Sequence, residues 1–525
     1  MDYRSGSRGG LALAAAVGLA AQGIVAAPVG SAATSRAAAV TVAADTLTTA
    51  QRRAIDEFVA GAMEELDLVP GLALAVVVDD AIVHESGFGW ANVERREPVT
   101  AETVFYTASL SKALTGMAAA VLAAENRLDL DAPITRWYPG LDFPAPLAPA
   151  ESTTVRRLFT HTPRFLNSGV NFYPTFVGRY TDAELVRVLN GYSVPNNGFR
   201  YSNMSYAIAS EILGKAGGAA WQDVIAAAVF EPVGMRRTTA RASRVPIRGV
   251  ATPYTRTTGG FLARPPLKTD DNITGAGGFY STARDLARYV VANLNEGRID
   301  GRQALPAAAV REARRPQAEV DAEFFEFHRR AYGLGLYVAD YDGDTLLHHF
   351  GGIAGGFRSH MSWMPEHRIG VVVLQNEADT GSNLSDVVAT YVYDFLLGRP
   401  DVEARARRRL DALVGSTSER IEAATRLAAR ADSAAAARRT PALDLGAYAG
   451  TYENERIGRV HIRPGSDGLR VDWGEIDAPL IPLGGDDFLV EWQPGYPPAT
   501  WTFKVADGEV PGFDWDGRAF PRAEP

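Results

Sequence analysis

Strand-like segments at both ends of a long helical region constrain the fold of this chain more than any other feature. The run at 71–78, GLALAVVV, is continuously apolar, as buried strands are, and a second strand pattern at 81–91 follows the turn Asp79-Asp80. Strand patterns return at 331–376, ending in RIGVVVLQN. We therefore expect one antiparallel sheet built from distant parts of the chain, with the site in a cleft between sheet and helices.

The intervening stretch, about 107–330, shows helical periodicity broken by loops that contain Pro and Gly. This pattern predicts a helical subdomain inserted into the sheet unit. Further helices are expected at 51–66, 281–294 and 381–397. The resulting fold class is α+β, with an antiparallel sheet flanked by helices.

The end of the chain has a different texture. Residues 399–440 are rich in Ala, Arg and Glu and are expected to form a helical linker. Short alternating segments then fill 441–525, and Asp-Gly pairs at 467–468 and 507–508 are typical of hairpin turns. We expect a separate small domain here, similar to a β-barrel.

The N-terminal residues have the layout of a secretory signal. Arg4 and Arg8 precede an Ala-rich apolar run, and small residues follow that run. We expect residues 1–33 to be a cleaved signal peptide and 34–50 a flexible segment, which predicts a secreted or periplasmic protein. A membrane anchor is the alternative, but the run is shorter than the roughly 20 strongly apolar residues that a span needs, so no stable membrane span is predicted.

Charge and cysteine content exclude several classes of function. The formal net charge of -9 over 525 residues argues against a nucleic-acid partner, because such binding needs concentrated positive charge. The chain has no cysteine, which excludes a thiol nucleophile, disulfides and a cysteine zinc site. The eight histidines lack HExxH-type spacing, so neither a metal nor another cofactor is predicted.

The stretch YTASLSKALTG, at 106–116, carries the first candidate chemistry. Ser109 and Lys112 lie one helical turn apart at the start of a helix with an apolar stripe. Only four of the 53 Lys and Arg residues are lysines. Unlike arginine, a buried lysine can lose its proton and assist a serine nucleophile. On this motif alone the alternative stays open, namely a capping serine and a surface lysine.

Two further motifs accompany the Ser-x-x-Lys pair. Tyr-Ser-Asn at 201–203 opens another predicted helix, and His-Phe-Gly-Gly at 349–352 stands near the end of a strand. In this order the motifs resemble those of the serine β-lactamase and penicillin-recognising superfamily, in particular its class C-like branch of D-aminopeptidases and esterases. The resemblance covers 51–398. The loop at 160–165, THTPRF, departs from the Ser-Gly that many relatives have after His-Thr, and a structural role is expected for His161.

The resemblance implies roles for four residues. Ser109 would be the acyl-accepting nucleophile, and Lys112 the neighbour that tunes it. Tyr201 would be the general base that later protonates the leaving group, and Asn203 a hydrogen-bond partner of substrate and Lys112. Because a free tyrosine has a pKa near 10, this role requires a nearby ammonium to stabilise the phenolate.

The motif at 349–352 would complete the site. Backbone N–H groups of Ser109 and Gly352 would form the oxyanion hole, with Gly351 beside them for substrate binding. His349 stands where many β-lactamases use a lysine against the substrate carboxylate. Since His348 points to the opposite face of the strand, it is expected to be structural. A mostly uncharged histidine near neutral pH weakens a carboxylate anchor.

The predicted function is that of an exported serine hydrolase acting through an acyl-enzyme on a small ester, amide or D-amino-acid peptide. A class C-type β-lactamase or a DD-peptidase of the penicillin-binding kind is the alternative within the same chemistry. A non-catalytic receptor of the same fold is the alternative from another class. The domain at 441–525 resembles the lipocalin-like domains of some relatives, and an oligomer is compatible with the sequence.

Overall fold

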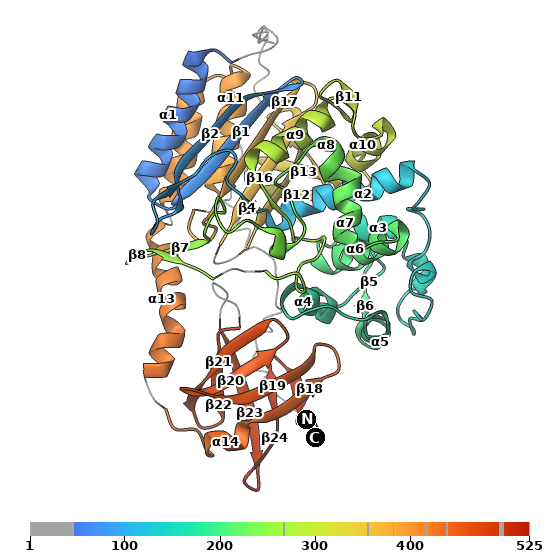
Figure 1. Ribbon diagram of the computed structural model, residues 1–525, viewed down its shortest axis with the longest axis vertical. Coiled ribbons are helices and arrows are strands. Elements are labelled where there is room, and N and C mark those ends of the chain that lie inside the picture. Colours follow the sequence, from blue (N-terminus) through green and yellow to red (C-terminus); the bar gives the residue numbers. More distant parts are fainter. Residues whose placement is uncertain are drawn as a thin grey trace, which may run out of the picture.

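The computed structural model describes residues 47–265, 268–353, 356–381, 383–415, 417–436, 439–492 and 498–523. A large unit of sheet and helices lies above a smaller β domain, and α13 (Thr417–Ala436) runs beside both (Figure 1). The predicted signal peptide and residues 34–46 lie outside the described residues. The first helix begins at Thr49, capped by the Thr48 side chain. Within the described part of the chain, no helix is both long and apolar enough to cross a membrane.

One nine-stranded sheet forms the centre of the large unit, in the order β12-β13-β14-β15-β16-β17-β1-β2-β3. β1 (Gly71–Val78) pairs antiparallel with β17 (Ile369–Gln375), although these strands come from opposite ends of the unit. This pairing confirms the predicted sheet built from distant parts of the chain. The other strands are β2 (Ala81–Asn92), β3 (Glu97–Pro98), β12 (Ala318–Phe324), β13 (Phe327–Tyr332), β14 (Tyr337–Tyr341), β15 (Asp344–Gly352) and β16 (Arg358–Met364).

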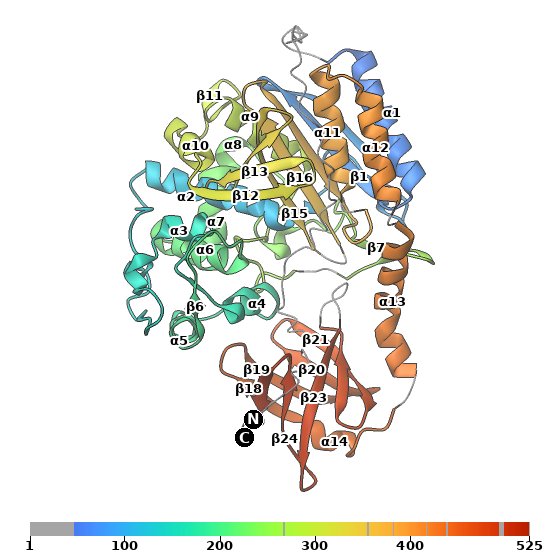
Figure 2. The same cartoon turned by 180° about the vertical axis from the view of Figure 1, so that it is seen from behind.

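Helices cover both faces of the sheet (Figures 1 and 2). Consequently β1 is buried along its whole length, with Leu72 and Leu74 in the core on one face and Ala73 and Ala75 in the core on the other. This explains its continuous apolar run. One layer contains α1 (Thr49–Leu66), α11 (Leu384–Leu396) and α12 (Val402–Val414), and the other contains α2 (Ser111–Ala124), α9 (Ala283–Leu294) and α10 (Ala307–Arg314).

The inserted helical subdomain lies between α2 and α9 in the chain, as predicted. Its helices are α3 (Val155–Phe159), α4 (Ser168–Phe176), α5 (Asp182–Tyr192), α6 (Asn203–Gly217), α7 (Trp221–Ile225) and α8 (Glu231–Val233). Of these, α6 and α7 pack beside α2, and α3 to α6 lie at the lower right of the large unit in Figure 1. Short strand pairs join the loops, including β4 (Phe105–Tyr106) with β9 (Tyr280–Ser281).

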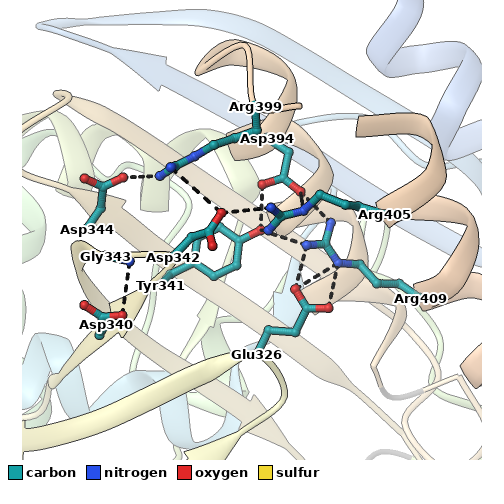
Figure 3. A network of polar contacts seen from close by, with 10 residues as sticks. All are labelled: Glu326, Asp340, Tyr341, Asp342, Gly343, Asp344, Asp394, Arg399, Arg405 and Arg409. Atoms are coloured by element: carbon teal, nitrogen blue, oxygen red, sulfur yellow. Dashed lines mark hydrogen bonds and ion pairs between the residues drawn. The ribbon is translucent and has the colours of Figure 1, made fainter. Parts of the chain in front are cut away.

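A buried ion network fixes α12 to the sheet (Figure 3). Asp394 of α11 is fully buried and accepts hydrogen bonds from the Tyr341 hydroxyl at 2.7 Å and from Arg409 Nη1 at 2.8 Å. Arg405 Nε lies 3.0 Å from the same carboxylate, and Glu326 binds the guanidinium of Arg409. The helix α12 is therefore part of the core of the large unit.

The C-terminal domain is a nearly closed barrel of eight antiparallel strands in chain order. A bridge between Tyr452 and Arg522 joins the two outer strands. The predicted hairpins at 467–468 and 507–508 are present. The strands are β18 (Gly450–Asn454), β19 (Gly458–Gly465), β20 (Gly468–Trp473), β21 (Ile476–Gly484), β22 (Asp487–Val490), β23 (Ala499–Ala506), β24 (Glu509–Trp515) and β25 (Arg518–Pro521).

Candidate active site

Ser109 lies in the turn that leads into α2. It is the central residue of a 3₁₀ turn, Ala108–Leu110, and the α-helix begins at Ser111. Ala108 has a φ of 47°, in the left-handed region that residues with a Cβ rarely adopt. Ser109 itself is partly exposed, and Leu110, which has no polar side chain, occupies the cap position of α2. Ser109 is therefore not the helix cap that the alternative reading required.

Lys112 is fully buried on α2, so it is not a surface lysine. Its Nζ contacts three oxygens, at 3.2 Å from Ser109 Oγ, 2.8 Å from Asn203 Oδ1 and 2.6 Å from the carbonyl oxygen of Ala276. Burial lowers the pKa of Lys112 well below its ordinary value, because it disfavours the charged form. The amine can therefore lose its proton while it touches the Ser109 hydroxyl.

Tyr201 stands just before α6, whose first turn is capped by the Ser202 hydroxyl. Its ring centroid is 4.8 Å from Lys112 Nζ. The ring is partly exposed, but its buried hydroxyl makes no hydrogen bond of normal geometry with the described residues. Burial raises the pKa of Tyr201 and the nearby Tyr337 adds to this, while the Ser109 hydroxyl opposes it. Ser109, Lys112 and Tyr201 thus converge on one place.

His349 faces the same place from β15. Its Nδ1 lies 2.6 Å from the carbonyl oxygen of Phe350, so Nδ1 carries the proton and donates it, and Nε2 accepts from the Tyr332 hydroxyl at 3.1 Å. Burial lowers the pKa of His349 well below its ordinary value, and the charge of Lys112 adds to this. The structure thus holds His349 as a neutral imidazole. His348 points away, to Arg329.

Gly351 allows β15 to lie directly against the turn that carries Ser109. A Cβ at this position would come within 2.0 Å of the Thr107 carbonyl oxygen and 3.0 Å of the Leu110 nitrogen. That carbonyl also accepts a hydrogen bond from Ser359 of the neighbouring strand at 2.7 Å. Gly352, the last residue of β15, follows directly beside this contact. The strand and the serine turn are therefore held together without any side chain between them.

Sequence reasoning missed three groups that complete the site. His161, expected to be structural, accepts a hydrogen bond from the Ser202 backbone at 3.2 Å, and its ring lies 4.5 Å from the Tyr201 ring. Tyr332 binds His349. Ala276 contributes only a backbone oxygen, for which no side-chain signal exists. The His-Thr pair in LFTHT was the one available signal for His161.

A second serine-histidine-aspartate arrangement lies on the opposite face of the sheet. Ser362 Oγ is 2.7 Å from His360 Nε2, and His360 Nδ1 is 2.8 Å from Asp386 Oδ1. This is the order of a hydrolytic triad. However, all three residues are fully buried, and Ser362 also bonds to Tyr393 at 2.7 Å. Since no substrate can reach Ser362, this arrangement is structural.

The cavity of about 990 Å³ found in this structure lies away from Ser109. It lies between α7–α9 and the segment that follows α8, with Arg236, Arg241 and Arg284 among its lining residues. Neither Ser109 nor Lys112 lines it. Over the residues that the structure describes, no group of three His, Asp or Glu side chains is arranged to hold a metal ion.

Comparison with known proteins assigns this chain to a family. A family model described as Beta-lactamase matches residues 55–390. The chain belongs to the beta-lactamase family. This confirms the resemblance drawn from the sequence motifs, as well as the predicted fold. A second model, for a domain of unknown function (DUF3471), matches 434–524 and so covers the C-terminal barrel.

Two curated relatives resemble the chain over part of their length. A D-aminopeptidase of Gluconobacter oxydans (strain 621H) is 28% identical over 360 residues, 67% of this chain and 63% of that protein. Penicillin-binding protein 4* of Bacillus subtilis (strain 168) is 31% identical over 180 residues, 32% of this chain and 37% of that protein. The chain thus spans less than two thirds of either relative.

Solved structures share the fold of this chain. The octameric penicillin-binding protein homologue of Pyrococcus abyssi superposes with a TM-score of 0.57 at 22% identity, over 89% of this chain and 99% of that chain. The D-amino acid amidase of Ochrobactrum anthropi SV3 superposes with a TM-score of 0.53 at 24% identity, over 68% of this chain and 100% of that chain. At such identities the likeness concerns the fold alone.

Proposed function

We propose that this beta-lactamase family member is a serine hydrolase that forms an acyl-enzyme on Ser109. The observation that carries the proposal is the contact between Lys112 Nζ and Ser109 Oγ at 3.2 Å, inside a site where burial lowers the pKa of the amine. A neutral amine has two N–H donors and one lone pair. The two donors match Asn203 Oδ1 and the Ala276 carbonyl, which leaves the lone pair for the Ser109 hydroxyl.

In the proposed acylation, Ser109 Oγ attacks the substrate carbonyl carbon while its proton moves to Lys112 Nζ. The carbonyl becomes an oxyanion, which the backbone N–H groups of Ser109 and Gly352 would stabilise, each donor being worth roughly 10²–10³ in rate. The bond to the amine or alkoxide then breaks, and an ester to Ser109 remains. A water molecule, in the place of the leaving group, then attacks the ester carbonyl and gives a proton to Lys112. The bond to Ser109 Oγ breaks, Oγ takes up that proton, and the acid product leaves.

This scheme gives Tyr201 a different role from the phenolate base that the resemblance implies. Its raised pKa keeps the phenol protonated, and its hydroxyl has no hydrogen-bond partner of normal geometry among the described residues. The phenol is therefore free to pass a proton. We propose that the proton on Lys112 reaches the leaving group through the Tyr201 hydroxyl, so that no net charge is left on the site.

The proposed substrates are amides, esters or short peptides of D-amino acids. A D-aminopeptidase among the relatives and a D-amino acid amidase among the structures of the same fold support this class. The neutral His349 supports it too, because a β-lactam carboxylate meets no positive charge there. β-Lactamase or DD-peptidase action is the second candidate, supported by the penicillin-binding relative.

Labelling and turnover together test the proposal. A fluorophosphonate probe should attach to Ser109, as located by mass spectrometry, and should not attach to the Ser109→Ala variant. Steady hydrolysis of D-aminoacyl anilides, faster than of their L-enantiomers and than of nitrocefin, is the expected result. A stable adduct on Ser109 without turnover would instead favour a receptor or a cell-wall peptidase. Absence of any adduct would overturn the hydrolase proposal.

We further propose that residues 1–33 are a cleaved export signal and that the protein works outside the cytoplasm. The Ala-rich run behind Arg4 and Arg8 supports this. N-terminal sequencing of the mature protein from its native host is the test.

The octameric homologue supports an oligomer, which light scattering would measure. For the lipocalin-like barrel we propose no catalytic group of its own, since aromatic rings such as Trp473, Trp501 and Phe513 fill its interior.

A further inference from the structure

The helix α4 has two faces that contact different parts of the molecule. Phe172 and Phe176, four residues apart, belong to the core of the C-terminal barrel. Asn167, which caps the helix, and Asn171 and Thr175 lie at the same spacing on another face, toward the helical subdomain. Residues spaced by four share a helix face, so α4 packs against the barrel on one face and against the rest of the helical subdomain on another.

The barrel face of α4 is well packed. The Phe172 ring lies 5.4 Å from Trp473 and 5.2 Å from Trp515, and Phe176 lies 4.8 Å from Trp492. The backbone at the end of the helix is also fixed, since the Glu475 nitrogen donates to the Val177 carbonyl at 2.8 Å. The barrel therefore determines where α4 sits.

The other face of α4 holds the loop that carries Tyr201 and Asn203. Asn171 Oδ1 accepts hydrogen bonds from the Ser202 hydroxyl at 3.3 Å and from the Met204 backbone nitrogen at 3.1 Å. These donors belong to the residues on either side of Asn203, whose amide oxygen binds Lys112. One asparagine therefore links the helix to two of the predicted catalytic residues.

The C-terminal end of α4 reaches the same lysine by a second route. The buried Lys268 donates to the Thr175 carbonyl oxygen and, at 3.3 Å, to the carbonyl oxygen of Asn272. Asn272 Nδ2 donates to the Phe176 carbonyl oxygen at 3.4 Å. The segment continues to Ala276, whose carbonyl oxygen accepts from Lys112 Nζ. The middle of α4, at Asn171, and its C-terminal end are thus both tied to groups that hold Lys112.

We propose that the C-terminal barrel acts on the reaction through α4, and that Asn171 is a positioning residue for Tyr201 and Asn203. The inference rests on the proposed function, because it assigns these residues to the chemistry. The barrel contributes no proton or electron pair. It fixes α4, and α4 fixes the loop at 201–203. Since a shift of about 1 Å in a catalytic group can cost about 100-fold in rate, we expect the larger effect on kcat and a smaller one on KM.

Gly474 offers a test from the barrel side. It has a φ of 59°, and a Cβ there would come within 2.2 Å of the Val177 carbonyl oxygen at the end of α4. We expect Gly474→Ala to lower kcat, and the rate of fluorophosphonate labelling of Ser109, about tenfold to 100-fold, with KM within about twofold. The matched control is Gly508→Ala, in another barrel hairpin with a φ of 80° and open space around the Cβ. The control should keep kcat.

Asn171 offers the test from the catalytic side. Asn171→Ala should lower kcat similarly, whereas Asn171→Asp keeps the accepting oxygen and should restore most of it, with kcat taken from the plateau of each pH profile. If both routes act through α4, combining Asn171→Ala with Gly474→Ala should cost no more than the larger single effect. Should Gly474→Ala fail to fold, Phe172→Leu replaces it.

The outcomes separate this inference from the proposed function. If the unaltered protein is not labelled at Ser109, the proposed function fails. If it is labelled and turns over, but Gly474→Ala and Asn171→Ala keep its kcat and labelling rate, only the inference is overturned. Equal losses in Gly474→Ala and Gly508→Ala would also overturn it, because they would reflect general damage to the barrel.

Discussion

Lys112 Nζ and Asn203 Oδ1 lie 2.8 Å apart, although 91 positions separate the two residues in the sequence. The contact ties the serine helix α2 to the first turn of α6. It also orients the amine, so that the lone pair of its nitrogen faces the Ser109 hydroxyl. Activity in this site should therefore depend on the protonation of Lys112.

We expect kcat/KM to rise with pH and then level off. The rising limb reports the loss of the Lys112 proton, at a pH well below the ordinary lysine value because burial lowers its pKa. Lys112→Arg should lower kcat by about 10²–10⁴, since arginine stays protonated. Lys215→Arg, at an exposed ion pair with Asp182, is the matched control and should leave kcat and the pH profile unchanged. A flat pH profile would contradict the role of the amine.

Lys268 should make stability depend on pH. Burial lowers its pKa to about 7, against ~10.4 in the unfolded chain. Between these values the unfolded state binds more protons, so the free energy of unfolding rises with pH, by at most ~1.4 kcal/mol per unit. Lys268→Met should remove the share of this slope that Lys268 contributes and leave the share of the buried Lys112, in urea unfolding measured from pH 7 to 10. The exposed Lys504→Met should keep the whole slope, and equal slopes in both variants would contradict the prediction.

Asp394 should be essential for stability but not for chemistry. Asp394→Asn leaves Arg405 and Arg409 without their buried carboxylate (Figure 3), and losing one partner of a buried pair costs about 3–5 kcal/mol. The exposed pair of Asp411 and Arg407 lies on α12, as Arg405 and Arg409 do, and provides the control. Asp411→Asn should cost less than about 1 kcal/mol. Denaturant unfolding measures both. Similar losses in the two variants would show that Asp394 is not effectively buried.

Ser362 should not be a nucleophile, despite its contacts with His360. Ser362→Ala should keep fluorophosphonate labelling, while Ser109→Ala abolishes it. The loss of the hydroxyl leaves His360 Nε2 without this partner and removes one hydrogen bond of the Tyr393 hydroxyl, so stability should fall by about 1–3 kcal/mol. Thermal unfolding and labelling, measured on the same samples, separate the two effects. Loss of labelling in folded Ser362→Ala would contradict this assignment.

Local pattern was enough to predict much of this molecule. The apolar run at 71–78 and the turn after it predicted a buried hairpin strand, and the Ser-x-x-Lys spacing placed an amine beside a hydroxyl on one helix. The loop at 201–203 could be placed at a helix start, because Ser202 is a good capping residue. Each of these features depends on neighbours in the sequence.

The rest depends on contacts that have no periodic signal. The Ala276 carbonyl is a backbone atom, and Asn171 resembles any asparagine in a short helix, so neither could be found before the chain was folded. The same holds for Phe172, whose pattern fits an ordinary core helix although its partners belong to another domain. Burial raises the pKa of Tyr201, a direction that the sequence pattern alone does not give.

The pairing of β1 with β17 has a consequence for synthesis. A nascent chain that has not yet delivered residues 369–375 to the outside of the ribosome has no partner for one edge of β1, and the middle of the sheet stays open. Contacts of such long sequence separation form slowly. Almost the whole sheet unit must therefore be translated before Ser109 gains its native surroundings.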